Sequence, residues 1–427
     1  MRVKISGGRV IDPGKLDGVM DILLEDGKIT DIAEKIETGD VEGDIRVIDA
    51  SGKIVTPGLI DMHVHFRDPG HEYKETVRTG CLAAAHGGFT GVCTMPNTDP
   101  VNDNRQITEY IIREAGIANG ARVWPVAAIS KGLQGKQLCE YGDLKDGGAI
   151  ALSDDGNPVS DSQMMRRALE YAKGFGLLII SHAEDLSLAG NGVMNEGAVA
   201  TRMGLPGIPN VAESIAIMRD IALAELTDAP IHIAHVSTRE SVHAIRDAKK
   251  RGIRVTAETA PHYFTLTDEA VEAYNTNAKM NPPLRSHHDQ EAIIEGLADG
   301  TLDAIATDHA PHAIIEKEVE FDHAANGIIG LETSLPLGLK LVEKGILSLT
   351  ALIEKMSVNP ARILGIDNRL KVGNPADITI MTPDQPHIVK AADFQSISRN
   401  TPFDGWSLKG KALLTMVGGN IVFDEIS

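Results

Sequence analysis

The chain has little cysteine, few aromatic residues and no long apolar run. Its three cysteines, Cys81, Cys93 and Cys139, cannot all pair among 427 residues, and their spacing does not match a zinc ribbon. This scarcity disfavours a disulfide-built secreted protein and makes a reducing, cytoplasmic compartment the expected one. The absence of about 18 consecutive apolar residues argues against a membrane-spanning helix. The N-terminus also has no apolar segment typical of a signal peptide.

Basic residues are scarce as well. Forty-one Lys and Arg stand against 60 Asp and Glu, which gives a formal net charge of −19. This charge argues against nucleic acid or an anionic membrane as the main partner. It also means that an anionic small-molecule substrate would need a dedicated cation in its site. The hydrophobic fraction of 42% is ordinary for a globular protein, and the length suits a large domain with a smaller one.

Both ends of the chain have the pattern of short strands separated by turns. Near the start, Val3–Ile5 leads into Gly7-Gly8, a pair that is typical of a turn between strands. Apolar and alternating stretches return near the C-terminus. We expect residues 1–56 and residues 346–427, the second segment beginning with a linking helix, to build one satellite β-sandwich domain together.

Between residues 57 and 345 the pattern changes to strand, loop and helix, repeated. The expected strands are apolar on both faces, as in a parallel sheet covered by helices. Eight such units predict a (β/α)8 TIM barrel as the catalytic domain. The alternative is an open doubly wound sheet, but no G-x-G-x-x-G follows the first strand. The expected strands are Leu59–His63, Gly91–Met95, Val123–Ala128, Ala149–Leu152, Leu177–Ser181, Ile231–Ala234, Ile253–Ala257 and Asp303–Ala306.

The first barrel strand runs into two histidines. Residues two apart in a strand point to the same face, so His63 and His65 present two imidazoles side by side, and Arg67 follows on that side. Two histidines at this spacing suit a first-row divalent metal. The alternative is two partly buried histidines without a metal, because short motifs match by chance. Arg67 is the first candidate for the cation that an anionic substrate would need.

Further ligand-type residues follow later strands, and the C-terminal strand ends of a parallel barrel face one site. Asp155 follows strand four, His182 strand five, His235 strand six and Asp308 strand eight. Such groups are costly to bury together unless they pair or bind metal, so we predict a metal centre of one or two ions. Alternatively, Asp155 forms an Asx turn and Asp308 caps a helix. His232 is expected to face away from the lumen and to be structural.

The stretch from Asp61 to Gly70, DMHVHFRDPG, is similar to the signature of the amidohydrolase superfamily in its dihydroorotase form. With this motif the sequence resembles the class I dihydroorotases of that superfamily. The resemblance spans nearly the whole chain, including the terminal β-domain. Its other motifs are Met95-Pro96-Asn97-Thr98, Ser153-Asp154-Asp155-Gly156, Met280-Asn281-Pro282-Pro283-Leu284-Arg285 and Ala306-Thr307-Asp308-His309-Ala310-Pro311-His312.

The resemblance implies a role for each matching position. His63 and His65 would bind a first zinc ion, and Asp155 would bridge it to a second. His182 and His235 would bind that second ion. Asp308 would ligate the first ion and act as general base and general acid. Substrate contacts would come from His65, Arg67, Asn97, Asn281, His312 and the backbone at Asn326 and Gly327.

The implied reaction is the zinc-dependent, reversible hydrolysis of the cyclic amide of dihydroorotate to N-carbamoyl-aspartate, the third step of de novo pyrimidine biosynthesis. Many relatives in other branches bridge their metals with a carboxylated lysine on strand four; here Asp154-Asp155 stands in that place, so no carbamate is expected. The alternatives are another cyclic amidase, such as a hydantoinase, dihydropyrimidinase or allantoinase, and a non-catalytic scaffold for aspartate transcarbamoylase. The resemblance also allows a homodimer and a complex of the active enzyme with aspartate transcarbamoylase.

Overall fold

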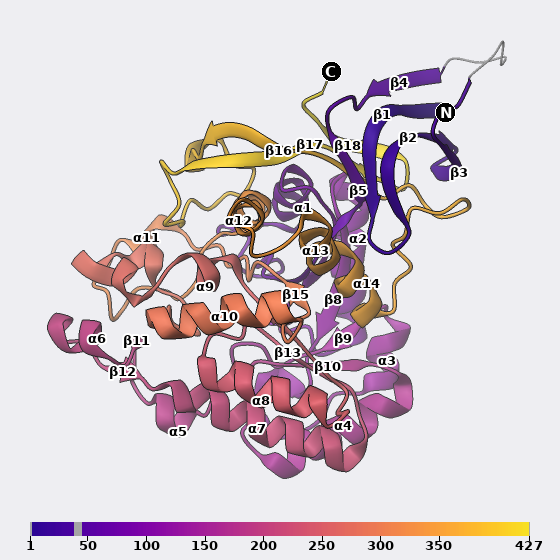
Figure 1. Cartoon of the computed structure of the whole chain (residues 1–427). Coiled ribbons are helices and arrows are strands. Elements are labelled where there is room, and N and C mark those ends of the chain that lie inside the picture. Colours follow the sequence, from indigo (N-terminus) through magenta and orange to yellow (C-terminus); the bar gives the residue numbers. More distant parts are fainter. Residues whose placement is uncertain (1, 38–44, 427) are drawn as a thin grey trace.

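The computed structural model describes residues 2–37 and 45–426, and its centre is an eight-stranded parallel barrel ringed by helices (Figure 1). The barrel closes where the first strand meets the segment after the last. Val64 forms a parallel bridge with His309, and the His65 amide donates to the His309 carbonyl at 2.8 Å. The barrel strands are β6 (Leu59–Val64), β7 (Phe89–Thr94), β8 (Arg122–Ala127), β9 (Ala151–Leu152), β10 (Leu178–Ser181), β13 (Ile231–Ile233), β14 (Val255–Thr259) and β15 (Ala304–Ile305).

The predicted barrel is confirmed, and each predicted strand overlaps one of these eight. Every residue of β6 and of β7 is buried. Strands that are covered on both faces must be apolar along their length, and this is why their positions can be recognised in the sequence.

Several of the helices that surround the barrel begin at side chains that cap them. The first of them begins at Val77, because Thr76 is extended and its side chain accepts from the Thr79 amide. In the same way Asn104 caps α2 and Thr238 caps α8. The helices of the repeating units are α1 (Val77–His86), α2 (Arg105–Ala118), α3 (Tyr141–Asp146), α4 (Ser162–Phe175), α7 (Asn210–Thr227), α8 (Arg239–Lys250), α9 (Pro261–Thr265), α10 (His287–Asp299), α11 (Ile314–Lys317) and α12 (Leu331–Glu343), followed by α13 (Leu349–Ile353) and α14 (Asn359–Leu364).

Strands from both ends of the chain lie side by side in one sheet above the barrel, indigo and yellow in Figure 1. The order is β18-β17-β16-β5-β1-β2-β3, with β4 paired to β1. This sheet folds over, so that Gly27 between β2 and β3 contacts Gly418 after β17. The expected β-sandwich is therefore one continuous sheet. Its strands are β1 (Arg2–Asp12), β2 (Leu16–Glu25), β3 (Lys28–Ala33), β4 (Ile45–Asp49), β5 (Ile54–Pro57), β16 (Ile378–Ile388), β17 (Ser407–Val417) and β18 (Asn420–Asp424).

The two faces of this sheet have different partners. Ile5, Ile378 and Leu414 lie in a core that the folded sheet encloses. On the other face, the hydroxyl of Thr415 donates to the Ala85 carbonyl of α1 at 2.7 Å. The chain passes from β5 to β6 across Gly58, beside the boundary that we predict at residues 56 and 57. Residues 1 and 38–44 of the expected N-terminal segment lie outside the described residues.

The prediction of a turn at Gly7-Gly8 is wrong. Both residues lie inside β1, where the pairing with β2 shifts between Ile5 and Gly8. Gly7 has a positive φ of 71°, and a Cβ on Gly8 would come within 2.6 Å of the Val55 side chain. The glycines therefore allow a β-bulge and a close approach of β5, which a sequence pattern does not separate from a turn.

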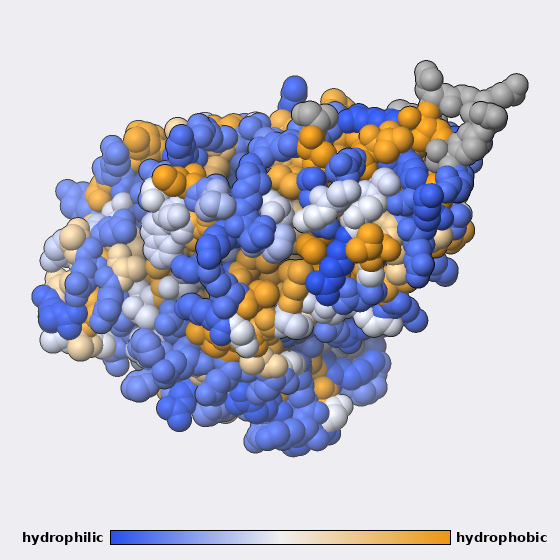
Figure 2. All heavy atoms as spheres, turned by 45° about the horizontal axis from the view of Figure 1, so that its top comes forward, coloured by the Kyte–Doolittle hydropathy of each residue, from blue (hydrophilic) through white to orange (hydrophobic). Residues whose placement is uncertain are grey.

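Residues 186–208 form a small insertion beside the barrel, where the sequence contains a segment rich in Gly and Asn. The elements are α5 (Leu186–Ala189), β11 (Met194–Asn195), α6 (Ala198–Met203) and β12 (Gly207–Ile208), and the two strands pair in parallel. Figure 2 shows a surface on which hydrophilic residues predominate and hydrophobic ones form smaller groups. Among the described residues, no helix has the length and apolar character needed to cross a membrane.

Candidate metal centre and active-site cavity

A cavity of about 210 Å³ opens at the C-terminal ends of the barrel strands. The structure brings every predicted site residue to it: all of them line the cavity except His63, which is fully buried at its floor. The lining residues are His65, Arg67, Asn97, Asp155, Gly156, His182, His235, Asn281, Asp308, Ala310, His312, Asn326 and Gly327.

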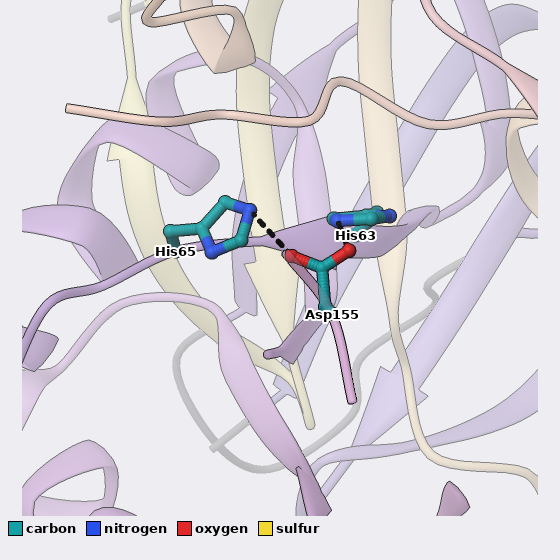
Figure 3. Close-up of side chains that lie close together, drawn as sticks. All are labelled: His63, His65 and Asp155. Carbon is teal, nitrogen blue, oxygen red and sulfur yellow. Dashed lines mark ion pairs between the residues drawn. The ribbon is translucent and has the colours of Figure 1, made fainter. Parts of the chain in front are cut away.

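The Asp155 carboxylate is at the centre of four imidazoles. Its Oδ1 lies 3.3 Å from His63 Nε2, 3.4 Å from His182 Nδ1 and 3.6 Å from His235 Nε2. Its Oδ2 lies 3.5 Å from His65 Nε2. Figure 3 shows His63 and His65 directed at the two oxygens of this one carboxylate. Two triads share Asp155 and have the ligand types and spacing of a metal site: His63-His65-Asp155 and Asp155-His182-His235.

Asp308 adds a second carboxylate beside the first triad. Its Oδ1 is 3.1 Å from His65 Nε2 and 3.7 Å from His63 Nε2. Burial would raise the pKa of Asp308, but the hydrogen bond from His65 and the nearby histidines outweigh burial and lower it. The group is therefore an ionised carboxylate across the physiological range, the form that accepts a proton.

The field at the centre favours cations. Burial would raise the pKa of Asp155, yet His63, His182 and His235 lower it well below its usual range. Conversely, Asp155 and Glu184 outweigh burial and raise the pKa of His182 to about 10. His63 Nε2 and Asp155 Oδ1 are buried without a hydrogen-bond partner, although they face each other. Such a donor set fits a divalent metal, which would satisfy both atoms.

Glu258, at the end of the barrel interior, supports the centre from below. Its Oε1 accepts from His63 Nδ1 at 3.0 Å, which leaves His63 Nε2 free to face Asp155. Its Oε2 lies 3.2 Å from His232 Nε2, and His232 Nδ1 is 2.8 Å from Thr256 Oγ1. The prediction that His232 faces away from the lumen is therefore wrong. Regular β13 ends at Ile233 and His235 has a positive φ of 35°, so alternation does not carry from 232 to 235.

Arg67 and His312 form the other wall of the cavity. The Arg67 Nε donates to the Pro311 carbonyl at 3.2 Å, and its Nη2 is 3.4 Å from His312 Nε2. His312 Nε2 donates to the Asn326 carbonyl at 2.8 Å. Burial, together with Arg67 and nearby lysines, lowers the pKa of His312 to about 2, so the ring is neutral. This wall therefore presents a guanidinium and a neutral imidazole to the cavity.

Two amide side chains line the space between the metal-type cluster and this wall. The Asn97 carbonyl oxygen lies 2.8 Å from His65 Nδ1, so it accepts the ring proton and leaves His65 Nε2 directed at Asp308. The Asn281 amide donates to Glu184 Oε2 at 3.2 Å. Asp154, beside Asp155, is not at the centre, because its carboxylate accepts from the Ser130 amide at 2.9 Å.

Three residues of the site have left-handed backbone. The φ angle is 61° at Arg67, 35° at His235 and 50° at Asp308. Non-glycine residues adopt this region at a cost of order 1 kcal/mol or more, which the surrounding structure must offset. In each case the strained residue follows a barrel strand, so the turn aims its side chain into the cavity.

A larger hollow of about 330 Å³ lies between α2, β8 and the β17–β18 turn. Within the described residues its one charged lining side chain is Arg122, which is paired with Asp377 at 2.6 Å. Among the described residues, its lining therefore offers no cluster of titratable or metal-ligating side chains.

A parallel barrel with imidazoles and carboxylates gathered at its C-terminal strand ends defines the amidohydrolase class of metal-dependent barrel enzymes. A family model described as dihydro-orotase-like matches residues 52–241. The dihydroorotases of Desulforapulum autotrophicum and Syntrophus aciditrophicus are each 58% identical to this chain, over 425 and 427 residues, with 100% of both chains covered. The solved L-hydantoinase (dihydropyrimidinase) from Arthrobacter aurescens has a TM-score of 0.88 at 28% identity, covering 99% of this chain and 96% of its own. This chain belongs to the dihydroorotase family.

Sequence reasoning missed three charged residues that contact the site. Glu258 holds His63, Glu184 holds Asn281, and Lys317 binds the carbonyl of Gly327 at 3.1 Å. The one available signal was an acidic residue inside an apolar strand, Glu258, because burying an unpaired carboxylate is costly.

Proposed function

We propose that this protein is a dihydroorotase of class I, which hydrolyses the cyclic amide of dihydroorotate reversibly to N-carbamoyl-aspartate. The amide C–N bond breaks, a C–O bond to water forms, and one proton of that water goes to the nitrogen. In the direction of pyrimidine biosynthesis the ring closes and water leaves. The observation that carries this proposal is the partly buried Arg67 in the same small cavity as the His and Asp cluster.

Zinc is the metal that we propose, in one or two ions. His63, His65 and Asp308 would hold one ion, His182 and His235 the other, and Asp155 would bridge them. His nitrogens and carboxylate oxygens are the ligand types that zinc takes in catalytic sites. The separations of 3.3 to 3.6 Å between Asp155 and the imidazoles support this choice. When bound, zinc polarises a carbonyl and lowers the pKa of water towards about 7.

Asp308 would move the proton. Its ionised carboxylate can accept a proton from the attacking water and return it to the amide nitrogen as the C–N bond breaks. Asp308 Oδ1 lies 3.1 Å from His65 Nε2, which places this carboxylate over the centre. Its lowered pKa keeps the carboxylate ionised, the form in which it can accept a proton in the hydrolytic direction.

Arg67 would bind the ring carboxylate of the substrate. A guanidinium can make two parallel hydrogen bonds to a carboxylate, which fixes the orientation of the ring as well as its charge. Within the part of the chain that the structure describes, Arg67 is the only Arg or Lys that lines the cavity. His65 and Asn97 would support the carboxylate side, whereas Asn281, His312 and the backbone of Asn326 and Gly327 would contact the ring.

A hydantoinase-type cyclic amidase is the competing function, since a solved hydantoinase shares the fold. Hydantoin has no ring carboxylate, so it would leave Arg67 unpaired in a buried site. The deciding experiment compares turnover of dihydroorotate, hydantoin and allantoin by the purified protein, together with its metal content. Turnover of dihydroorotate alone supports the proposal, and turnover of hydantoin alone contradicts it. A homodimer, a complex with aspartate transcarbamoylase and a cytoplasmic location stay predictions.

A further inference from the structure

A buried lysine lies behind the wall of the cavity, outside the groups that the proposed chemistry uses. Lys317, at the end of α11, is 3% exposed. Its ammonium donates to the carbonyls of Ala325 at 2.7 Å, Gly327 at 3.1 Å and Lys279 at 3.4 Å. A buried cation costs free energy unless it is compensated, and here backbone carbonyls supply the compensation. Methionine would fill the same space without that cost, so packing alone does not explain an ammonium at this position.

The contact with Ala325 sets the direction of the next amide. In a trans peptide the C=O and N–H point in opposite directions. Because the Ala325 carbonyl points at Lys317, the N–H of Asn326 points away from it. The following peptide is fixed too, since the Gly327 amide donates to the Lys279 carbonyl at 2.9 Å and the Asn326 carbonyl accepts from His312.

The backbone N–H of Asn326 differs from those of its neighbours. In the described structure it has no hydrogen-bond partner, whereas its neighbours on both sides are bonded. Asn326 and Gly327 both line the active-site cavity. An oriented and unbonded N–H at the wall of a polar cavity is a donor for a ligand oxygen.

We propose that Lys317 is a positioning residue: its ammonium orients the Ala325–Asn326 peptide so that the Asn326 N–H donates to an oxygen of the ring-shaped substrate. This inference rests on the proposed function for the identity of that substrate. Burial and the neighbouring Lys279 lower the pKa of Lys317 to about 7, which agrees with a cation held at a cost for the sake of its contacts.

The first test is Lys317→Met, which removes the ammonium and keeps the length of the side chain. The KM for dihydroorotate is expected to rise about tenfold, the effect of one lost hydrogen bond to a charged ligand. The value of kcat and the metal content should change little, because the amide binds ground state and transition state alike. An unchanged KM would overturn the proposal.

Lys279→Met is the matched control. Lys279 is also buried, and its ammonium donates to the carbonyls of Asp322 at 2.9 Å and Ala324 at 2.7 Å in the same segment. Its ammonium does not contact Ala325 or Gly327, and the Lys279 backbone carbonyl that accepts from the Gly327 amide stays in the variant. The loss of this ammonium should therefore lower the melting temperature in the same manner without the tenfold rise in KM. Equal rises in KM for both variants would show a general effect of loosening the segment and would overturn the proposal.

A second variant covers the case in which Lys317→Met does not fold. Asn326→Pro removes the proposed donor itself and leaves Lys317 in place, and position 326 is exposed. The same rise in KM is expected, and a wild-type KM would overturn the proposal. Hydrogen exchange of the Gly327 amide adds a readout that needs no substrate, and it should accelerate in Lys317→Met. Failure of the wild-type protein to turn over dihydroorotate would instead contradict the proposed function.

Discussion

The Glu258 carboxylate and the His63 imidazole form a buried pair, 3.0 Å apart, beneath the metal-type cluster. The carboxylate accepts a hydrogen bond from the Nδ1–H of His63. It therefore favours the tautomer whose unprotonated Nε2 faces Asp155 and Asp308. Burial would raise the pKa of Glu258, but hydrogen bonds and charge from His232 and His63 lower it to about 2. Glu258 therefore orients His63, a proposed metal ligand that does not line the cavity.

Glu258→Gln is expected to weaken metal binding about 10–100-fold, because groups that orient a ligand histidine contribute by that amount. The amide keeps the volume but offers one acceptor where Glu258 offers two, so His63 and His232 can no longer both donate to it. Metal retention during titration with a chelator measures the effect. Affinity equal to that of the wild type would show that His63 is oriented without Glu258.

Asp308→Ala is expected to lower kcat about 10³-fold and to reduce metal content only in part, since His63, His65 and Asp155 remain. Asp308→Asn keeps the size and the hydrogen bond to His65 but cannot take up a proton, so it should lose comparable activity. Steady-state kinetics with metal analysis distinguishes the two losses. A fast Asp308→Asn enzyme would remove the proton-transfer role and leave Asp308 as a ligand only.

Arg67→Lys is expected to lower kcat/KM for dihydroorotate about 10–100-fold, because lysine keeps the charge but cannot form the paired hydrogen bonds. The left-handed backbone at this position is unchanged by the replacement, so folding should be retained. Melting temperature is the control for folding. Wild-type kinetics in this variant would show that the carboxylate is bound elsewhere.

Stability should carry a pH signature from Glu332 of α12. Burial outweighs its hydrogen bonds from Ser396 and Gln395 and raises its pKa to about 8. The folded state thus keeps a proton that the unfolded chain has lost, and stability falls as pH rises from about 4.5 to 8. Glu332→Gln should reduce the loss of unfolding free energy between pH 5 and pH 8 by on the order of 1 kcal/mol, a figure lowered for partial exposure. The measurement is the free energy of unfolding of both proteins at pH 5 and at pH 8. The same change between the two pH values in the wild type and in Glu332→Gln would contradict the prediction.

The barrel and its ligand types could be predicted from the sequence because one rule governs both. Parallel strands buried on two faces are unbroken apolar runs, and chemistry gathers where they end. His63, Asp155, His182 and Asp308 each follow such a run, so the sequence places them at one mouth. In the structure, Asp155 Oδ1 lies 3.3 Å from His63 Nε2 and 3.4 Å from His182 Nδ1.

Supporting residues could not be predicted in the same way. Glu258 lies inside a short strand, and whether its side chain faces the lumen depends on how the closed barrel sets the pleat. The prediction that His232 faces away from the lumen failed for a related reason. Side chains alternate between faces only along a regular strand, and the backbone leaves the strand conformation by His235. Lys317 follows Ile314 and Ile315, which are exposed, so local sequence gives no sign that its ammonium is buried.

The pairing of β5 with β16 links parts of the chain that are made far apart in time. Ile54 lies opposite Met381, and everything between them belongs to the barrel and the helices that follow it. At about 5–20 residues per second, synthesis separates the two strands by tens of seconds. During that interval β5 has an unsatisfied edge on a nascent chain whose barrel is already emerging. The terminal sheet is therefore the last part that can be completed. A chain that ends before β16 would keep an unpaired edge on β5, which could pair with a strand of another chain, beside an otherwise complete barrel.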